Sequence, residues 1–378
     1  MTAETALVTG GAGLIGSHLV DLLVTQGWRV RILDNLEPQT HAAAPAYLNP
    51  QAEVITGDVR DVAAVERALA GVDVVFHQAA YGGYMPEVAR FIDVNVLGTA
   101  RILEAIRDLQ LPVRKVVLAS SQAVYSEGAV RCADHGVRFP PPRALAQLER
   151  GEFEVRCPAC GATTTPVATP EDAPVGGENI YAVSKYAEER LALAWGTQSD
   201  IPVVPLRYSC TYGPRQSLRN PYTGVIAIFV TRILNRLPPV VFEDGAQTRD
   251  LGFAGDVARA NLLAASSAAW DGRPVNIGSG VPTSILDLAR ALCAELDPSI
   301  EPLVSGQFRV GEIRALTADT GRALAAGHAP RVDLRAGLRA YIEWVAEQGE
   351  VTERFSRAAE SLRATGMLRR ARVPAGDA

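Results

Sequence analysis

The chain has 378 residues, 48% of them hydrophobic and 21% charged. This length favours about two domains, or one large domain with an added lobe. A formal net charge of −5 argues against a nucleic-acid partner, because that binding depends on Lys and Arg neutralising phosphates. No run approaches the ~18 apolar residues of a membrane span, and the start of the chain has no signal-peptide pattern. Five cysteines, an odd count, disfavour a disulfide framework and favour the reducing cytoplasm.

Short apolar runs alternate with helix-like segments through the first half of the chain. The runs are β-branched and bounded by Gly, Asp or polar residues, which predicts buried strands at Ala6–Thr9, Val30–Leu33, Val54–Thr56, Val72–Phe76, Val116–Ala119 and Val203–Leu206. Helical periodicity predicts helices over Leu14–Gln26, Val62–Ala70, Glu87–Leu109 and Tyr181–Thr197. Such alternation predicts an α/β fold, a doubly wound parallel sheet of the Rossmann type with helices on both faces.

The predicted organisation has four parts. Residues 1–206 form the Rossmann domain, and residues 207–350, which are punctuated by Gly and Pro, form a smaller substrate-binding lobe partly interleaved with it. Residues 127–174 are rich in Pro, Arg and Cys and lack sustained periodicity, so we interpret them as an insertion. Residues 351–378 form an Arg-rich tail, interpreted as a solvated or frayed terminus.

A glycine-rich turn joins the first predicted strand to the first helix. Gly10, Gly13 and Gly16 allow a tight turn, close approach of the backbone to a pyrophosphate, and close packing of helix on strand. The helix N-terminus then offers free N–H groups to the phosphates. Asp34 ends the second strand and suits a ribose 2′-OH, which favours NAD over NADP. The alternative is a glycine-rich turn that binds no ligand.

Tyr181 and Lys185 are four residues apart on one predicted helix, so their side chains share a face. A free tyrosine titrates near pH ~10, and a nearby ammonium and a positive nicotinamide both favour its phenolate form. Ser121 follows the fifth predicted strand and is placed to hydrogen-bond the same substrate hydroxyl. The three residues together predict proton transfer beside a nicotinamide.

These motifs resemble the extended short-chain dehydrogenase/reductases of the NAD-dependent nucleotide-sugar epimerase/dehydratase family. Further matching segments are Asp34-Asn35, Gly57-Asp58-Val59, His77-Gln-Ala-Ala80, Asn95, Leu206-Arg-Tyr208, Tyr212-Gly-Pro214, Arg249-Asp250 and Asn276-Ile-Gly278. The resemblance implies catalysis by Ser121, Tyr181 and Lys185. It implies an NAD site made of Gly10, Gly13, Leu14, Ile15, Gly16, Asp34, Asn35, Asp58, Val59, Gln78, Ala79, Ala80, Tyr81, Asn95, Tyr181 and Lys185. It implies a nucleotide-sugar substrate held by Ser121, Asn220, Arg249 and Arg309, the two arginines gripping the diphosphate.

The residues after Ser121 bear on which reaction is catalysed. Dehydratases of the resembled family place an Asp-Glu pair there to supply an acid and a base, whereas this chain has Gln122 and Ala123. This difference favours C4 epimerisation through a 4-keto intermediate. The insertion and the segment from Gln216 to Gly224 resemble dTDP-L-rhamnose 4-epimerases, which interconvert dTDP-L-rhamnose and dTDP-6-deoxy-L-talose. Departures from the family are Cys210 in place of Asn, Ser126 in place of Gly, and Leu251-Gly-Phe253 in place of a segment with His and an acidic residue.

Four residues of the insertion have the spacing of metal ligands. Cys132-x₂-His135 and Cys157-x₂-Cys160 form a Cys₃His set suited to tetrahedral Zn²⁺. Four protein ligands leave no open position, so the predicted zinc is structural and folds a segment with little core of its own. The alternative is that His135 is a loop residue and the cysteines are free or form a disulfide.

Other functions stay open from the sequence. The chain is alternatively another nucleotide-sugar oxidoreductase, such as a dehydrogenase, decarboxylase or 4,6-dehydratase, or a non-catalytic NAD-binding scaffold. The resembled family pairs two helices into homodimers, and Glu87–Leu109 with Tyr181–Thr197 would provide that face.

Overall fold

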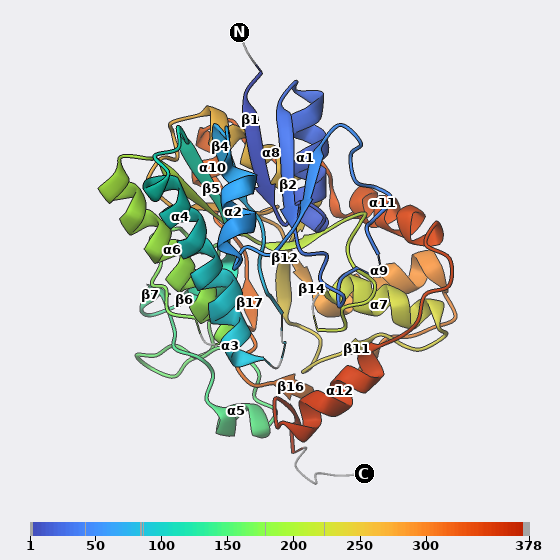
Figure 1. Cartoon of the computed structure of the whole chain (residues 1–378). Helices are drawn as coiled ribbons and strands as arrows, with labels where there is room; N and C mark the ends of the chain where they lie inside the picture. Colours follow the sequence, from blue (N-terminus) through green and yellow to red (C-terminus); the bar gives the residue numbers. More distant parts are fainter. Residues whose placement is uncertain are drawn as a thin grey trace, which may run out of the picture.

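A seven-stranded sheet lies at the centre of the computed structural model, which describes residues 3–41, 43–83, 85, 87–177, 179–222 and 224–372 (Figure 1). Its strands are all parallel and lie in the order β13 (Val275–Ile277), β9 (Val203–Tyr208), β5 (Lys115–Ser121), β4 (Val74–His77), β1 (Thr5–Thr9), β2 (Arg29–Asp34) and β3 (Glu53–Thr56). The six predicted strands are confirmed, and β13 adds a seventh at the edge. The predicted burial of Val54–Thr56 is wrong, because β3 is the other edge strand and most of its residues are exposed. The strand order reverses direction between β1 and β4, where doubly wound sheets bind ligands.

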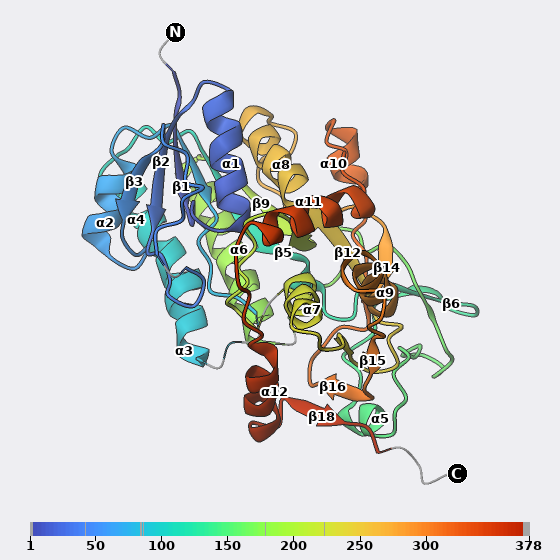
Figure 2. The ribbon, with the colours of Figure 1, turned by 90° about the vertical axis from the view of Figure 1, so that its right-hand side faces the viewer.

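Side chains of the sheet alternate between two cores. In β1, Ala6 and Val8 pack with α1 (Leu14–Thr25) and α8 (Ala254–Ser266), whereas Leu7 packs on the other face. That face is covered by α2 (Val62–Leu69), α4 (Gly98–Asp108) and α6 (Ile180–Ser199). Figure 2 shows the two helical layers on either side of the sheet. The predicted doubly wound α/β architecture is therefore confirmed.

The helix predicted over Glu87–Leu109 is divided. It contains α3 (Val88–Phe91), a π-helical turn η1 (Ile92–Leu97) and α4. The buried Asn95 lies in the π turn, where its side chain accepts from the Tyr81 N–H at 2.7 Å and donates to the Tyr81 carbonyl at 2.9 Å. Such turns inside helices are frequent at functional sites.

A second core lies beyond the sheet. Helices α7 (Val225–Leu234), α9 (Ile285–Leu296) and α11 (Leu334–Ala346) pack there with β12 (Thr248–Phe253). The strand β12 pairs with β10 (Cys210–Tyr212), β14 (Pro282–Ser284) and β17 (Ala315–Leu316), and β11 (Val240–Val241) pairs with β15 (Leu303–Val304). The intervening α8, β13 and α10 (Gly321–Ala325) return to the seven-stranded sheet.

The prediction of a frayed tail is wrong for residues 351–372. They form α12 (Phe355–Ala364) and β18 (Leu368–Arg370), and β18 pairs with β16 (Gln307–Arg309). Phe355, Leu362 and Leu368 are buried in the second core, because their apolar side chains line one side of an otherwise charged segment. Residues 1–2 and 373–378 of the predicted domain and tail lie outside the described chain.

The insertion has a small sheet of its own. A short 3₁₀ helix, η2 (Gln122–Tyr125), leads from β5 to β6 (Val130–Cys132), which pairs with β7 (Gly136–Arg138) and β8 (Thr165–Pro166). Helix α5 (Leu145–Glu149) lies beside β16 and β18, as Figure 2 shows. Among the helices of the described chain, none is long and apolar enough to cross a membrane.

Candidate active site

The glycine-rich turn has the backbone that its sequence predicts. Gly10 has a φ of +66°, and a Cβ there would lie 2.7 Å from the Ala79 nitrogen. A Cβ at Gly16 would lie 2.2 Å from the Gly10 carbonyl oxygen. Gly13 precedes α1 in extended conformation, and no side chain caps the helix. The first N–H groups of α1 therefore face outward, ready for an anion such as a pyrophosphate.

Acidic side chains surround a small cavity beside this turn. Asp34 is buried and accepts backbone N–H bonds from Ala12 at 2.9 Å and Leu36 at 2.8 Å. Asp58 accepts two bonds from the Arg60 guanidinium, both 2.8 Å, which lower its pKa to about 2. The cavity, about 160 Å³, is also lined by Asn35, Val59, Ala79 and Tyr81. Its carboxylates suit the hydroxyls of a ribose.

A larger cavity of about 550 Å³ shares Gly10, Gly13, Gln78 and Ala80 with the smaller one. It extends from the α1 N-terminus across the carboxyl end of the sheet to the second core. Fourteen of the predicted cofactor residues line one cavity or the other: Gly10, Gly13, Leu14, Ile15, Gly16, Asp34, Asn35, Asp58, Val59, Gln78, Ala79, Ala80, Tyr81 and Tyr181. The four predicted substrate residues, Ser121, Asn220, Arg249 and Arg309, line the larger one. Thr223, in the predicted substrate segment, lies outside the described residues.

Ser121 and Tyr181 reach the larger cavity from different elements. Ser121 ends β5, and its hydroxyl accepts the Ala123 N–H at 3.2 Å. Tyr181 lies in the first turn of α6, which Asn179 caps by accepting the Ala182 N–H at 2.9 Å. A Cβ at Gly82 would lie 3.3 Å from the Tyr181 ring, so the missing side chain makes room for that ring.

Lys185 lies in the interior instead of on the cavity wall. Its ammonium pairs with Glu188 at 2.5 Å, and both side chains are 1% exposed. Glu188 also accepts from the Thr99 hydroxyl at 3.2 Å, and its carboxylate lies 3.8 Å from His77. Burial raises the pKa of Glu188 to about 7, and burial with the nearby Lys185 lowers the pKa of His77 to about 3. Sequence reasoning missed Glu188, since its burial depends on tertiary packing.

Arg249 and Arg309 share one carboxylate. Glu312 lies 2.7 Å from the Arg249 guanidinium and 3.2 Å from that of Arg309. All three line the larger cavity. Two guanidiniums at the wall of one cavity suit the oxygens of a diphosphate. In the sequence, only the position of Glu312 three residues after Arg309 indicates that the two side chains pair.

Two residues that depart from the family pattern meet at the cavity wall. Gln122 donates from its side-chain amide to the Cys210 sulfur at 3.6 Å. Burial raises the pKa of the Cys210 thiol, which keeps it neutral. Neither side chain is a carboxylate.

The four predicted metal ligands come together in the insertion. Their ligand atoms all lie within 4.8 Å of one another. The Cys132 sulfur lies 3.6 Å from His135 Nδ1 and 3.8 Å from the Cys160 sulfur, and the Cys157 sulfur lies 3.8 Å from His135 Nδ1. The Cys132 and Cys160 sulfurs are thus farther apart than the ~2.05 Å of a disulfide, and none of the three cysteines forms one.

The chain thus combines a Rossmann sheet and its glycine-rich turn with two joined cavities, the larger of which Ser121 and Tyr181 line. Residues 6–143 and 158–278 match the NAD dependent epimerase/dehydratase family. The chain belongs to that family of short-chain dehydrogenase/reductase enzymes. The unmatched residues 144–157 lie in the insertion.

Similar proteins agree with this assignment. A dTDP-L-rhamnose 4-epimerase of Burkholderia thailandensis is 35% identical over 350 residues, which is 90% of this chain and 95% of that protein. UDP-glucose 4-epimerase of Thermotoga maritima, solved with UDP-glucose, has a TM-score of 0.74 and 29% identity and covers 92% of this chain and 100% of its own. UDP-glucose 4-epimerase of Thermus thermophilus, solved with NAD, has a TM-score of 0.70 and 29% identity, and the match covers 92% of this chain and 100% of that one. Decarboxylases and a dehydratase are related at 27–30% identity.

Proposed function

We propose that the protein catalyses NAD-dependent C4 epimerisation of a nucleotide-diphospho-sugar through a 4-keto intermediate. The observation that carries this proposal is the larger cavity, which brings Ser121 and Tyr181 together with Arg249 and Arg309. One cavity would thereby hold both a proton-transfer group, Tyr181, and two diphosphate-binding groups, Arg249 and Arg309. The relatives named as 4-epimerases support the same reaction class.

The glycine turn and the acidic cavity fit NAD. Backbone N–H groups at the start of α1 would receive its pyrophosphate, and Asp34 and Asp58 would accept bonds from the adenosine ribose. A 2′-phosphate would meet the same carboxylates, which favours NAD over NADP. When bound, NAD would supply the acceptor and then the donor of a hydride at the sugar C4.

Tyr181 would exchange the sugar's 4-OH proton. It takes the proton from the hydroxyl as C4 loses hydride, and the C4–O bond becomes a carbonyl. The keto sugar then turns over in the cavity, and Tyr181 returns the proton as hydride reaches the opposite face of C4. Ser121 orients the oxygen throughout. No net oxidation occurs, so no external oxidant or reductant is consumed.

We further propose a dTDP-linked 6-deoxyhexose as substrate, with dTDP-L-rhamnose and dTDP-6-deoxy-L-talose as the interconverted pair. The Cys/His insertion, the segment from Gln216 to Asn220, and the 35% identical relative support this pair. Gln122 and Ala123 in place of an acid–base pair disfavour a 4,6-dehydratase.

A substrate panel tests the function. Purified protein incubated with dTDP-L-rhamnose and no reductant should yield a second, C4-epimeric species by NMR. UDP-glucose and UDP-galactose serve as comparison substrates that separate the reaction class from the sugar. Steady accumulation of reduced nicotinamide would instead indicate net oxidation, and no conversion of any dTDP- or UDP-sugar would refute the proposal.

We also propose structural Zn²⁺ at Cys132, His135, Cys157 and Cys160. Zn–S and Zn–N bonds of about 2.3 and 2.0–2.1 Å around a tetrahedral ion imply S···S and S···N distances of about 3.8 and 3.6 Å. The separations of 3.6 and 3.8 Å in this cluster fit those values. Four ligands leave no coordination position for substrate, so the metal would hold the insertion's fold.

A further inference from the structure

The insertion packs directly on the strand that carries Arg309. Leu148 in α5 and Phe153 form an apolar cluster with Phe308, which is fully buried in β16. Phe308 immediately precedes Arg309, so the insertion covers the back of a cavity-lining residue. The insertion is therefore not an independent appendage of the fold.

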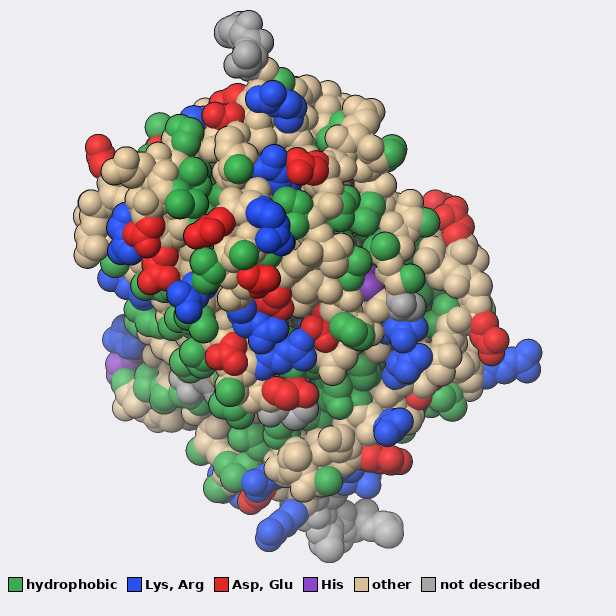
Figure 3. All heavy atoms as spheres, viewed as in Figure 1, with side chains coloured by type: hydrophobic (Ala, Val, Ile, Leu, Met, Phe, Trp, Pro, Cys, Tyr) green, Lys and Arg blue, Asp and Glu red, His purple; other side chains and the backbone are tan. Residues whose placement is uncertain are grey.

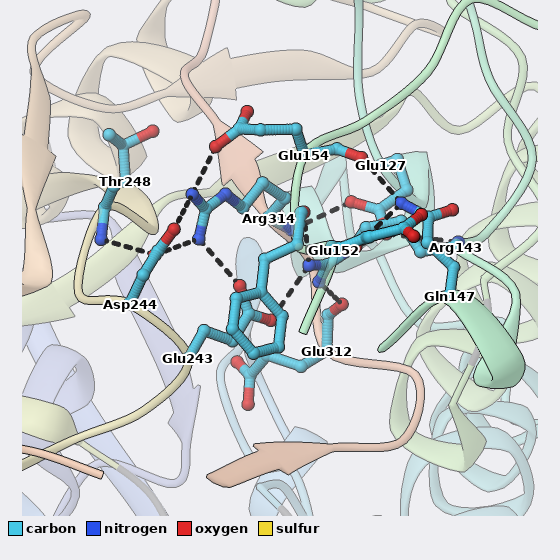
Figure 4. A network of polar contacts seen from close by, with 12 residues as sticks. Glu127, Arg143, Gln147, Glu152, Glu154, Glu243, Asp244, Thr248, Glu312 and Arg314 are labelled. Atoms are coloured by element: carbon cyan, nitrogen blue, oxygen red, sulfur yellow. Dashed lines mark hydrogen bonds and ion pairs between the residues drawn. The ribbon is translucent and has the colours of Figure 1, made fainter. Parts of the chain in front are cut away.

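Arg143 of the insertion donates to four groups in this interface (Figure 4). Its side chain is 2% exposed. It donates to the Glu127 carboxylate at 2.8 Å, the Phe153 carbonyl at 2.9 Å, the Glu243 carboxylate at 2.9 Å and the Glu312 carbonyl at 2.7 Å. A guanidinium has five N–H donors in a fixed plane, so these contacts nearly saturate it.

Arg314 fixes the same segment from its other end. Its backbone N–H donates to Glu127 at 2.8 Å, and its guanidinium donates to Glu243 at 2.8 Å and to Asp244 at 2.6 Å. It also pairs with Glu154 of the insertion. Glu243 thus lies between the two guanidiniums of Arg143 and Arg314, and residues 312–314 are held from both sides (Figure 4).

The segment held in this way is the one that positions the cavity arginines. Glu312 receives the Arg143 bond on its carbonyl, while its carboxylate pairs with Arg249 and Arg309. The Arg314 carbonyl accepts the Thr248 N–H at 3.0 Å, which ties the same segment to the strand of Arg249. Displacement of the Glu312 backbone would therefore move both guanidiniums.

We propose that Arg143 is a positioning residue for substrate binding: it fixes the Glu312 backbone and thereby holds Arg249 and Arg309 where they bind the substrate diphosphate. This inference rests on the proposed nucleotide-sugar substrate. The proposed role concerns substrate affinity and not the cofactor site. None of the contacts described for Arg143 reaches the glycine turn or the small cavity around Asp34.

The test compares Arg143→Lys and Arg143→Met with wild type and with Arg138→Met, an insertion arginine that bonds only the Val137 carbonyl among the contacts described. Lysine keeps the charge but lacks donors in several directions. Calorimetry measures the Kd of dTDP and of UDP. KM and kcat are measured with the nucleotide-sugar that the wild type converts, and the amount of bound NAD is measured by absorbance.

Both Arg143 variants should raise Kd and KM about tenfold or more, since misplacement by ~1 Å can cost about 10²-fold. The kcat of both Arg143 variants should change less than KM, and their NAD content should equal that of the wild type. The Arg138→Met control should have the Kd, KM and kcat of the wild type. Because Arg143→Met removes one guanidinium partner from each of the buried carboxylates of Glu127 and Glu243, the double variant Arg143→Met/Glu243→Gln is included. It should recover thermal stability without recovering Kd.

Unchanged Kd and KM in a folded Arg143 variant would overturn the inference and leave the proposed function intact. Recovery of Kd together with stability in the double variant would also overturn it, because Arg143 would then act only on folding. A wild-type protein that binds neither nucleotide and converts no nucleotide-sugar would overturn the proposed function, and this inference with it.

Discussion

Tyr181 and Lys185 lie on one face of α6, and the ammonium of Lys185 is buried against Glu188. An ammonium near a tyrosine favours the phenolate, whereas a carboxylate paired with that ammonium weakens this effect. Helix α6 thus carries Tyr181 to the larger cavity and Lys185 into the interior. The pairing of Lys185 with Glu188 makes α6 more than a carrier of the Tyr-x-x-x-Lys motif.

Tyr181→Phe should lower kcat for epimerisation about 10²- to 10⁴-fold, because the variant loses the group that exchanges the 4-OH proton. NAD content should stay near wild type, since the glycine turn and the acidic cavity are untouched. NMR turnover and absorbance of released NAD measure the two quantities. Tyr186→Phe, on the same helix but packed against Val124 and Leu316 in a different cluster, is the matched control. Full turnover by Tyr181→Phe would remove Tyr181 from the mechanism.

Glu188→Gln should change how stability depends on pH. Burial raises the pKa of Glu188 from 4.5 to about 7, so its stabilising contribution is present below pH 4.5 and is lost as the pH rises through 7. The lowered pKa of His77, about 3 against 6.5, acts oppositely: its contribution is present above pH 6.5 and lost as the pH falls through 3. The two contributions offset each other between pH 4.5 and 6.5 in the wild type.

With Glu188 replaced, the His77 contribution is unopposed. The free energy of unfolding of Glu188→Gln relative to wild type should therefore rise from pH 5 to pH 7.5, by on the order of 1–3 kcal/mol. Urea unfolding at four pH values measures this difference. Glu189→Gln is an unsuitable control because it pairs with the buried Arg207, so the exposed Glu104→Gln serves. Parallel pH curves for wild type and Glu188→Gln would contradict the argument.

At the scale of elements, the insertion illustrates what sequence patterns reveal and what they omit. The spacing of Cys132, His135, Cys157 and Cys160 was enough to predict that they meet. Nothing in that spacing shows that Arg143 is buried, because two of its four acceptors, Glu243 and Glu312, lie 100 and 169 residues away along the chain. Contacts set by tertiary packing leave no local periodicity to detect.

Removal of the proposed zinc should loosen the insertion while the seven-stranded sheet stays folded. Wild-type protein after exhaustive dialysis should retain about one zinc per chain, measured by elemental analysis, and Cys157→Ser should retain much less. Proteolysis should then cut within residues 127–174 first. Cys293→Ser is the matched control, because Cys293 is buried in the second core away from the cluster. Well-folded wild type with little zinc would refute the structural metal.

For the whole molecule, the strands of the sheet were predictable because most are short β-branched runs. The central strands β1, β4 and β9 are buried at every residue, whereas β3 at the edge is mostly exposed. The edge strand β13 was missed: it has only three residues, Val275–Ile277, too few to show a pattern. The prediction of a frayed tail was wrong because the apolar pattern of residues 351–372 is also weak. Its arginines dominate the composition, while Phe355, Leu362 and Leu368 are spaced widely enough to escape notice until the second core brings them together.

One face of the molecule carries exposed apolar side chains on neighbouring helices. Val88, Ile92 and Leu97 project from α3 and η1, and Ile180, Val183 and Leu191 from α6, which packs beside them. Figure 3 shows hydrophobic side chains over this region, interspersed with charged ones. We propose this face as the interface of a homodimer formed by pairing of these helices with their copies. Contiguous exposed apolar surface is typical of such interfaces.

Val183→Asp should therefore convert a dimer into a monomer of 40.2 kDa, since Val183 is 47% exposed on this face and an unpaired carboxylate buried in the interface would be costly. Light scattering coupled to gel filtration gives the mass of each protein. Leu324→Asp, at a position 52% exposed on α10, introduces the same charge away from this face and should leave the mass of the wild type unchanged. A monomeric wild type, or a Val183→Asp variant that stays dimeric, would place the oligomer interface elsewhere or remove it.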